Sequence, residues 1–164
     1  MKNPRIAKLA QGAVIAALYV ALTFIFAPIS FREIQVRIAE AMTILPLFSG
    51  AAVPGLFIGC LLANFLSGAA LPDVIFGSIA TLLGAIGTRL LRNRKPVLGT
   101  IPPILANTLI IPFVLKYAYA VDLPIPLMML TVGLGEVLSC GVLGMILYFA
   151  LSKRRKAIFK NEEA

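Results

Sequence analysis

A small set of polar and ionisable side chains stands out because it interrupts long apolar segments. A charge at the centre of a bilayer costs about 2.5–3.5 kcal/mol on insertion scales, so such residues usually face a cavity or a partner. Carboxylates accept hydrogen bonds, whereas amide and guanidinium groups donate them, so together they can bind a small molecule that carries both donors and acceptors. The candidate substrate-binding residues are Glu136, Asn107, Asn64, Glu40, Arg37, Gln35 and Asp73.

Most of these residues also have a purely structural interpretation. Glu40 can pair with Arg37, three positions earlier on the same helical face. Asp73 follows a proline and fits the first turn of a helix, where the helix dipole favours an acid. The two asparagines can form hydrogen bonds between helices. Glu136 has no basic residue three or four positions away, so it is the leading candidate for a functional acid.

The inventory of side chains excludes several kinds of chemistry. The sequence has no His and no Trp, and its two cysteines, Cys60 and Cys140, both lie in apolar segments. Histidine-based catalysis, zinc sites of the Cys/His type and a disulfide framework are therefore not expected. No Ser–Lys or paired-aspartate motif occurs on the apolar segments, so an intramembrane enzyme would lack a nucleophile and a base. We therefore expect that the protein is not an enzyme and that it binds no metal ion and no other cofactor.

Composition places the chain in a membrane. Of its 164 residues, 60% are apolar and 13% charged, whereas soluble domains average about 45–50% and about 25%. A hydrocarbon core of about 30 Å needs roughly 20 apolar residues per helix. The sequence thus predicts an all-α membrane protein, a single integral domain over residues 1–164 built as a six-transmembrane-helix bundle. The predicted spans are residues 9–27, 38–49, 51–70, 74–91, 97–120 and 125–151, of which the second can be a short or tilted helix.

The basic residues test this topology independently. Twelve of the fifteen lie before the first span, between the fourth and fifth, or after the sixth; only Arg32, Arg37 and Lys116 lie elsewhere. Positive residues concentrate on the cytoplasmic side, so we expect a multi-pass cell-membrane protein with both termini in the cytoplasm. The polar candidates within the spans then all lie in the outer half of the bundle. The net charge of +8 reflects this topology, and contact with acidic phospholipids is a secondary consequence of it. No nucleic-acid partner is expected.

Small residues recur at helical spacing on two spans. Ala13, Ala17 and Ala21 repeat every four positions on the first, and Gly55 begins a similar series on the third. Such spacing lets helix backbones approach closely within a membrane. On the third span the pattern favours packing within the bundle. On the first it follows a basic tail, so either packing or the docking of a partner protein explains it.

An ordered set of motifs along the chain resembles a known family. The motifs are APIS at 27–30, IQVRIAEA at 34–41, VPGLFIGC at 53–60, AN at 63–64, DVIFGSIATL at 73–82, PP at 102–103 and GLGE at 133–136. Together with Asn107, they look like the queuosine-precursor substrate-binding subunits, or S components, of energy-coupling-factor (ECF) transporters. The resemblance extends from the first predicted span through the sixth.

The resemblance implies a six-helix S component that binds its ligand from outside the cell. It also implies partners, namely a transmembrane coupling subunit and two cytoplasmic ATPases, which agrees with the absence of a phosphate-binding loop from this sequence. In the family, an Ala-x-x-x-Ala element of the first helix contacts the coupling subunit. Ala13 and Ala17 match this element, and Ala17 and Ala21 offer a second register.

The side-chain inventory is compatible with a deazapurine ligand. A deazaguanine base presents an N–H and an amino group that one carboxylate accepts together, and a carbonyl oxygen that needs a donor. An aminomethyl substituent adds a cation, which calls for a second carboxylate. Glu136 and Glu40, with the amide and guanidinium groups, can meet these needs. Two alternatives stay open: an S component for another vitamin, and a self-contained small carrier that uses Glu136 for proton coupling.

Overall fold

The computed structural model is helical throughout the part of the chain that it describes, residues 4–26 and 37–154. Helices η1 and η2 are 3-10 helices, η3 is a π-helix, and the others are α-helices. The all-α class predicted from the sequence is confirmed. In chain order the helices are α1 (Pro4–Ile25), η1 (Ile38–Leu47), α3 (Ala52–Leu66), α4 (Leu71–Leu90), η2 (Pro96–Thr100), α5 (Ile101–Ala118), α6 (Ile125–Glu136), η3 (Val137–Leu143) and α7 (Gly144–Ser152).

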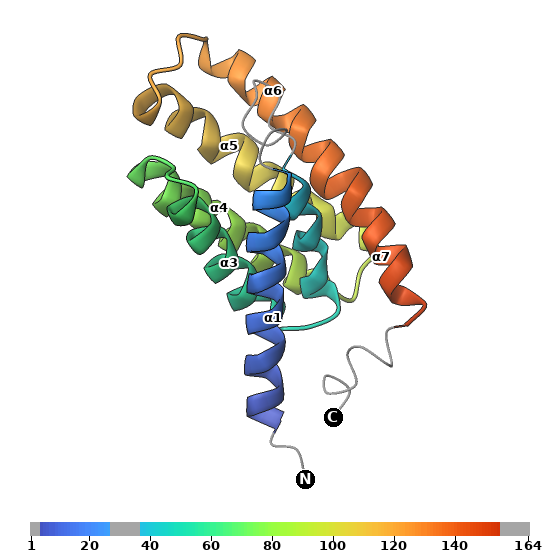
Figure 1. Cartoon of the computed structure of the whole chain (residues 1–164). Helices are drawn as coiled ribbons and strands as arrows, with labels where there is room; N and C mark the ends of the chain where they lie inside the picture. The colour runs from blue at the N-terminus through green and yellow to red at the C-terminus, as the bar shows by residue number, and fades with distance from the viewer. Residues whose placement is uncertain (1–3, 27–36, 155–164) are drawn as a thin grey trace.

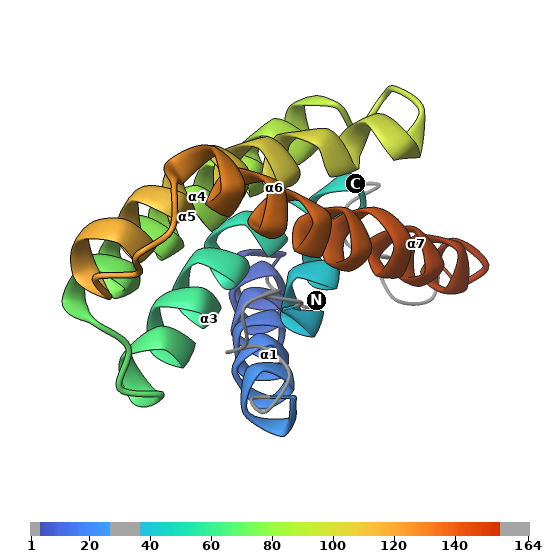
Figure 2. The ribbon, with the colours of Figure 1, turned by 90° about the horizontal axis from the view of Figure 1, so that it is seen from above.

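The helices pack around one short central helix. α1 lies against α3, α3 against α4, α4 against α5, and α5 against α6 (Figure 1). Helix η1 contacts α1, α3, α4, η2, η3 and α7, and every residue from Ala39 to Leu47 is buried. Seen from above, η1 lies between α1 and α7 (Figure 2). Side chains on η1 therefore meet side chains from most of the other helices.

Within the described residues, four helical stretches are long and apolar enough to cross a membrane: Arg5–Ile25, Leu71–Leu90, Pro96–Ala118 and Ile125–Ser152. They correspond to the first, fourth, fifth and sixth predicted spans. The second and third spans form shorter apolar helices, η1 and α3. At about 2.0 Å per residue, the ten residues of η1 extend about 20 Å, which is less than the hydrocarbon core of about 30 Å. The count of six crossings therefore stays a prediction.

The boundary between α3 and α4 differs from the predicted one. The apolar run continues to residue 70, but α3 ends at Leu66. Gly68 adopts a left-handed conformation with φ of 74°, and the amides at and after it donate to carbonyls in the last turn of α3. A glycine in this conformation is a common helix terminator. Helix α4 then begins at Leu71, because Pro72 has the fixed φ that suits a first turn.

Helices α1 and α3 approach each other closely through small residues. A Cβ atom added to Gly55 would lie 2.7 Å from the carbonyl oxygen of Gly12. One added to Gly59 would lie 2.8 Å from the Cβ atom of Tyr19. The glycines of the third span therefore serve packing within the bundle, as the sequence indicated.

An apolar groove runs along the exposed side of this helix pair. The alanines of α1 that match the family element line it, together with Ile58 and Leu62 of α3. The three alanine positions and both α3 side chains are exposed. Ala13, Ala17 and Ala21 thus share one exposed apolar surface, which we call the alanine face.

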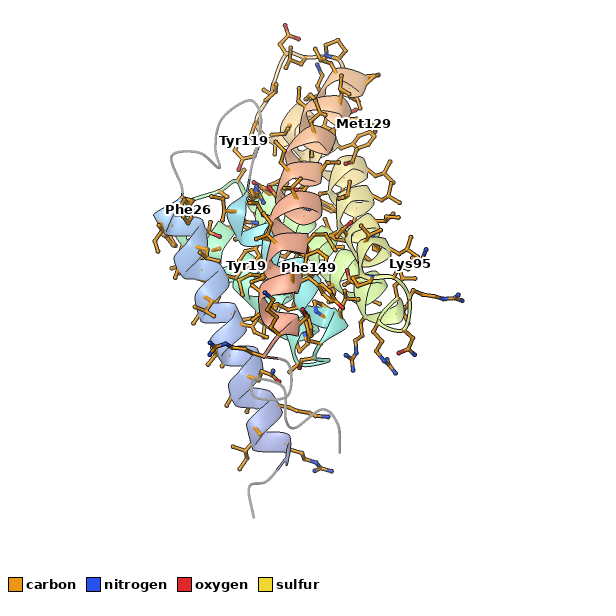
Figure 3. All side chains as sticks on the ribbon, turned by 90° about the vertical axis from the view of Figure 1, so that its right-hand side faces the viewer. Tyr19, Phe26, Lys95, Tyr119, Met129 and Phe149 are labelled. Atoms are coloured by element: carbon orange, nitrogen blue, oxygen red, sulfur yellow. The ribbon has the colours of Figure 1, made fainter. Side chains whose placement is uncertain are left out.

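The two ends of the bundle differ in charge. Helix α1 begins and α7 ends toward the lower end in Figure 1. Figure 3 shows Phe26 and Tyr119 toward the other end, whereas Lys95 lies lower. We call these the Tyr119 end and the Lys95 end. The segments that carry most of the described basic residues lie toward the Lys95 end: the start of α1, the turn between α4 and η2, and the end of α7.

Candidate functional site

Glu40 lies in the first turn of η1 and is 1% exposed. Its Oε1 atom accepts a short hydrogen bond from the hydroxyl group of Tyr19 on α1. The hydroxyl of Thr81 on α4 lies 3.4 Å from the same oxygen and shares its proton with the carbonyl of Gly77, at 3.1 Å. The Oε2 atom of Glu40 is buried without a hydrogen-bond partner in the protein. One carboxylate oxygen is thus held in place, while the other is available to a ligand.

Glu136 is the last residue of α6 and is 4% exposed. The Sγ atom of Cys140 donates to its Oε2 atom at 3.1 Å. A carboxylate oxygen of Glu40, a carboxylate oxygen of Glu136 and the Sγ atom of Cys140 all lie within 4.8 Å of one another. The helix changes from α to π directly after Glu136, and π turns inside helices are frequent at functional sites.

Asn107 of α5 lies beside both carboxylates and is 3% exposed. Its side-chain nitrogen has no hydrogen-bond partner. We call Glu40, Glu136 and Asn107 the carboxylate cluster. Oε2 of Glu40 and Nδ2 of Asn107 are both buried without a well-formed hydrogen bond, although Asn107 interacts with both acids. The hydroxyl groups of Thr108 and Ser139, also buried, lack partners as well.

Asp73, in the first turn of α4, is the centre of a second cluster. A guanidinium nitrogen of Arg37 lies 3.6 Å from its Oδ2 atom, and the Tyr119 hydroxyl donates to the same oxygen at 2.9 Å. The Asn64 amide nitrogen donates to the backbone carbonyl of Asp73 at 3.4 Å, and Oδ1 of Asp73 has no partner. Burial raises the pKa of the Tyr119 phenol, so this hydroxyl stays a neutral donor. We call these four residues the Asp73 cluster.

Helix α4 joins the two clusters. Asp73, Gly77 and Thr81 follow one another at one-turn spacing. A Cβ atom added to Gly77 would lie 3.0 Å from Oδ1 of Asp73. Of the seven predicted site residues, the structure places Glu40, Asn107 and Glu136 in one cluster and Arg37, Asp73 and Asn64 in the other. Gln35 lies outside the described residues.

The purely structural roles predicted for Glu40, Asp73 and the asparagines are confirmed only in part. Arg37 forms its described ion pair with Asp73 and not with Glu40. Asp73 does occupy the first turn of its helix, but its carboxylate also links two other parts of the chain. Asn64 joins α3 to α4, as expected of a polar contact between helices. The interpretation of Glu40 as one half of a local ion pair is therefore wrong.

The carboxylate cluster suits a small organic molecule with mixed hydrogen-bonding groups. Among the described basic residues, Arg37 is the one whose charge attracts both Glu40 and Glu136, and it already forms an ion pair with Asp73. Positive charge is thus scarce beside two buried acids. The spacing of Glu40, Glu136 and Cys140 would also suit a metal ion.

Comparison with known proteins bears on what such a site does. A family model described as QueT transporter matches residues 9–153. The chain belongs to the QueT transporter family. This membership confirms the resemblance seen in the motifs, and it confirms a transport protein rather than an enzyme.

One curated relative of this QueT family chain is the Queuosine precursor transporter QueT of Lactococcus lactis subsp. cremoris (strain MG1363). The two sequences are 35% identical over 85 residues, which cover 51% of this chain and 50% of the relative. The match therefore spans about half the length of each protein. No solved structure gives a significant match to the chain.

The predicted site of this QueT family chain lacked Tyr19 and Thr81. Both contact Glu40 from helices that are distant in sequence. A signal for Tyr19 was present, because a tyrosine in the middle of an apolar span needs a partner for its hydroxyl group. Thr81 lies two turns after Asp73 in α4, so helical spacing would have placed it on the same face.

Proposed function

We propose that this QueT family chain is the substrate-binding subunit of an ECF-type importer and captures a queuosine precursor of deazaguanine type from outside the cell for ATP-driven uptake. The family match and the name of the Lactococcus relative support this substrate class. The observation that carries the proposal is the carboxylate cluster. It combines two buried acids with an acceptor on Glu40 and a donor on Asn107 that both lack a well-formed hydrogen bond.

In the proposed complex, Glu136 accepts the paired N–H and amino donors of the base. Its Oε2 atom accepts from a thiol, which is a weak donor. The amide nitrogen of Asn107 donates to the carbonyl oxygen of the base, and Glu40 supplies a second carboxylate. Asp73, Arg37 and Asn64 form the entrance of the site, and Gln35 stays a predicted contact.

We further propose six membrane crossings with both termini in the cytoplasm. Four long apolar helices and two shorter ones support this count. The described basic residues at the Lys95 end support the orientation, because positive residues favour the cytoplasmic side. In this orientation the Tyr119 end faces outside, and the Asp73 cluster lies between the outer solution and the carboxylate cluster.

The alanine face is proposed as the docking surface for a transmembrane coupling subunit, which would connect the chain to two cytoplasmic ATPases. The exposure of Ala13, Ala17 and Ala21 supports this role, because small residues let a partner helix approach closely. The alanine face adjoins the contact between α1 and α3, because residues of both helices line the groove. The chain has no phosphate-binding loop, so ATP hydrolysis would take place in other subunits.

Calorimetric titration of the purified full-length chain tests the substrate class. We expect a one-to-one complex with 7-aminomethyl-7-deazaguanine and no heat of binding with common vitamins. Binding of another vitamin, with none of the deazaguanine, would assign the chain to that vitamin. Uptake of the deazaguanine by liposomes that contain this chain alone would identify a self-contained carrier. Co-purification with a coupling subunit and ATPases would support the importer.

A further inference from the structure

The two carboxylate oxygens of Glu40 have different surroundings. Oε1 accepts from Tyr19 and lies within reach of the Thr81 hydroxyl, whereas Oε2 accepts nothing. Tyr19 is 2% exposed, and its Cβ atom packs so closely on Gly59 that an added Cβ there would lie 2.8 Å away. This packing restricts the phenol. Hydroxyl groups from α1 and α4 therefore orient the carboxylate and leave Oε2 as one free, buried acceptor.

The two acids differ in what they can bind. A flat base edge with two adjacent donors needs both oxygens of one carboxylate. Glu136 suits such an edge better, because its described partner is a thiol at 3.1 Å. Glu40 has one oxygen already engaged by a phenol and therefore suits a single donor. The two acids are thus prepared for different parts of one ligand.

Charge favours a cation as the single donor at Glu40. Possible ligand atoms of Glu40 and Glu136 lie within 4.8 Å of each other, and both side chains are at least 96% buried. The charge of Arg37 attracts both carboxylates, but its ion pair, at 3.6 Å, is with Asp73. Two carboxylates this close repel each other, and a positive group between them relieves that repulsion. A hydrogen bond from an ammonium group is also about twice as strong as one from a neutral donor.

We propose that Oε2 of Glu40 binds an ammonium group, so that the site selects a base with a protonated aminomethyl substituent over the same base with an uncharged substituent. Tyr19 is a positioning residue for this selection, because it acts on the ligand through Glu40. The inference rests on the proposed function, since it requires the base to lie against Glu136 and Asn107.

Two probes of the same shape test the selection. 7-Aminomethyl-7-deazaguanine carries the ammonium group, and 7-ethyl-7-deazaguanine replaces it with a methyl group. Each is titrated calorimetrically into the full-length protein in one detergent. We expect the wild type to prefer the amine by about 10- to 100-fold, the range for a hydrogen bond to a charged group. In Glu40→Gln this preference should fall to about twofold or less, while the 7-ethyl probe binds nearly as before.

Tyr19→Phe tests the positioning role. It removes one hydroxyl group and keeps the ring, so it should weaken binding of the amine by about tenfold and binding of the 7-ethyl probe by less than about twofold. Tyr148→Phe is the matched control, because its ring stacks on Phe48 with 5.1 Å between centroids and no described contact with the carboxylate cluster. It should leave both affinities unchanged. If Tyr19→Phe does not fold, Thr81→Val removes the other hydroxyl near Oε1 and should reduce the amine preference less strongly.

The outcomes separate this inference from the proposed function. An equal loss of both probes in Tyr19→Phe would show a structural role and overturn the positioning role. Equal affinity of the wild type for the two probes would overturn the ammonium site and leave the proposed function intact. Binding of neither probe would overturn the proposed function itself. Stoichiometric binding of zinc chloride that displaces the amine would assign the two acids to a metal ion instead.

Discussion

Replacing Glu136 with Gln removes the proposed acceptor for the paired donors of the base. Gln has nearly the same shape, but its amide offers one acceptor oxygen where the carboxylate offers two, and its NH₂ group would face a ligand donor. A hydrogen bond to a charged group contributes about 1.5–3 kcal/mol. We therefore expect Glu136→Gln to weaken binding of 7-aminomethyl-7-deazaguanine by about 10- to 100-fold.

The fold should survive this change. Glu136 is 4% exposed, its described side-chain hydrogen bond comes from the thiol of Cys140, and it faces a second buried acid. Removing its charge relieves both desolvation and repulsion from Glu40. The melting temperature of the ligand-free variant should therefore equal or exceed that of the wild type.

Isothermal titration of both proteins in the same detergent, with a melting curve for each, measures these effects. Asp122→Asn is the matched control, because it makes the same chemical change at an exposed acid that lies 3.8 Å from Lys116. It should bind the ligand as the wild type does. Wild-type affinity in Glu136→Gln would refute the reasoning, and the acceptor for the paired donors would then have to be Glu40.

Three further predictions concern the entrance, the alanine face and the topology. Asp73→Asn should lower the free energy of unfolding by about 1–3 kcal/mol, because it weakens an ion pair and a phenol hydrogen bond; an unchanged melting temperature would contradict this. Ala13→Leu or Ala17→Leu should abolish uptake by cells that contain the whole transporter while calorimetry shows nearly normal ligand binding; normal uptake by both variants would remove the docking role. Cysteines substituted for Arg32 and Arg94 should react with an impermeant thiol reagent from opposite sides of the membrane, so labelling from one side would disprove the topology.

Hydropathy predicted the long helices, since a span of about 20 apolar residues can bury its backbone polar groups only by forming a helix. The second span shows where this reasoning ends. Residues 38–49 were predicted to form a short or tilted membrane helix, but Ile38–Leu47 form a 3-10 helix buried at the centre of the bundle. 3-10 helices longer than about four residues are uncommon and are not marked by a distinct residue pattern. The surrounding helices determine this conformation, and the local sequence pattern of these residues carries no information about that packing.

The site was predictable in its acids and not in their partners. Glu40, Asp73 and Glu136 were conspicuous because an acid in an apolar segment is costly. The donor to Glu40 lies 21 positions away in sequence, on another helix, and reaches it only through the packing of α1 on α3 and η1. Arg37 had an acid three residues away, yet it pairs with Asp73, 36 residues away. Local spacing identified the charged groups, but tertiary packing chose their contacts.

The described part of the chain leaves several buried polar atoms without partners, and their location argues for a ligand. Each such group costs about 1–3 kcal/mol when it remains unpaired, and native structures hold only a few. A ligand with both donors and acceptors could pair with Oε2 of Glu40 and Nδ2 of Asn107, and so recover part of this cost as binding free energy. The unpaired atoms are Oε2 of Glu40, Oδ1 of Asp73, Nδ2 of Asn107 and the hydroxyl oxygens of Thr108 and Ser139.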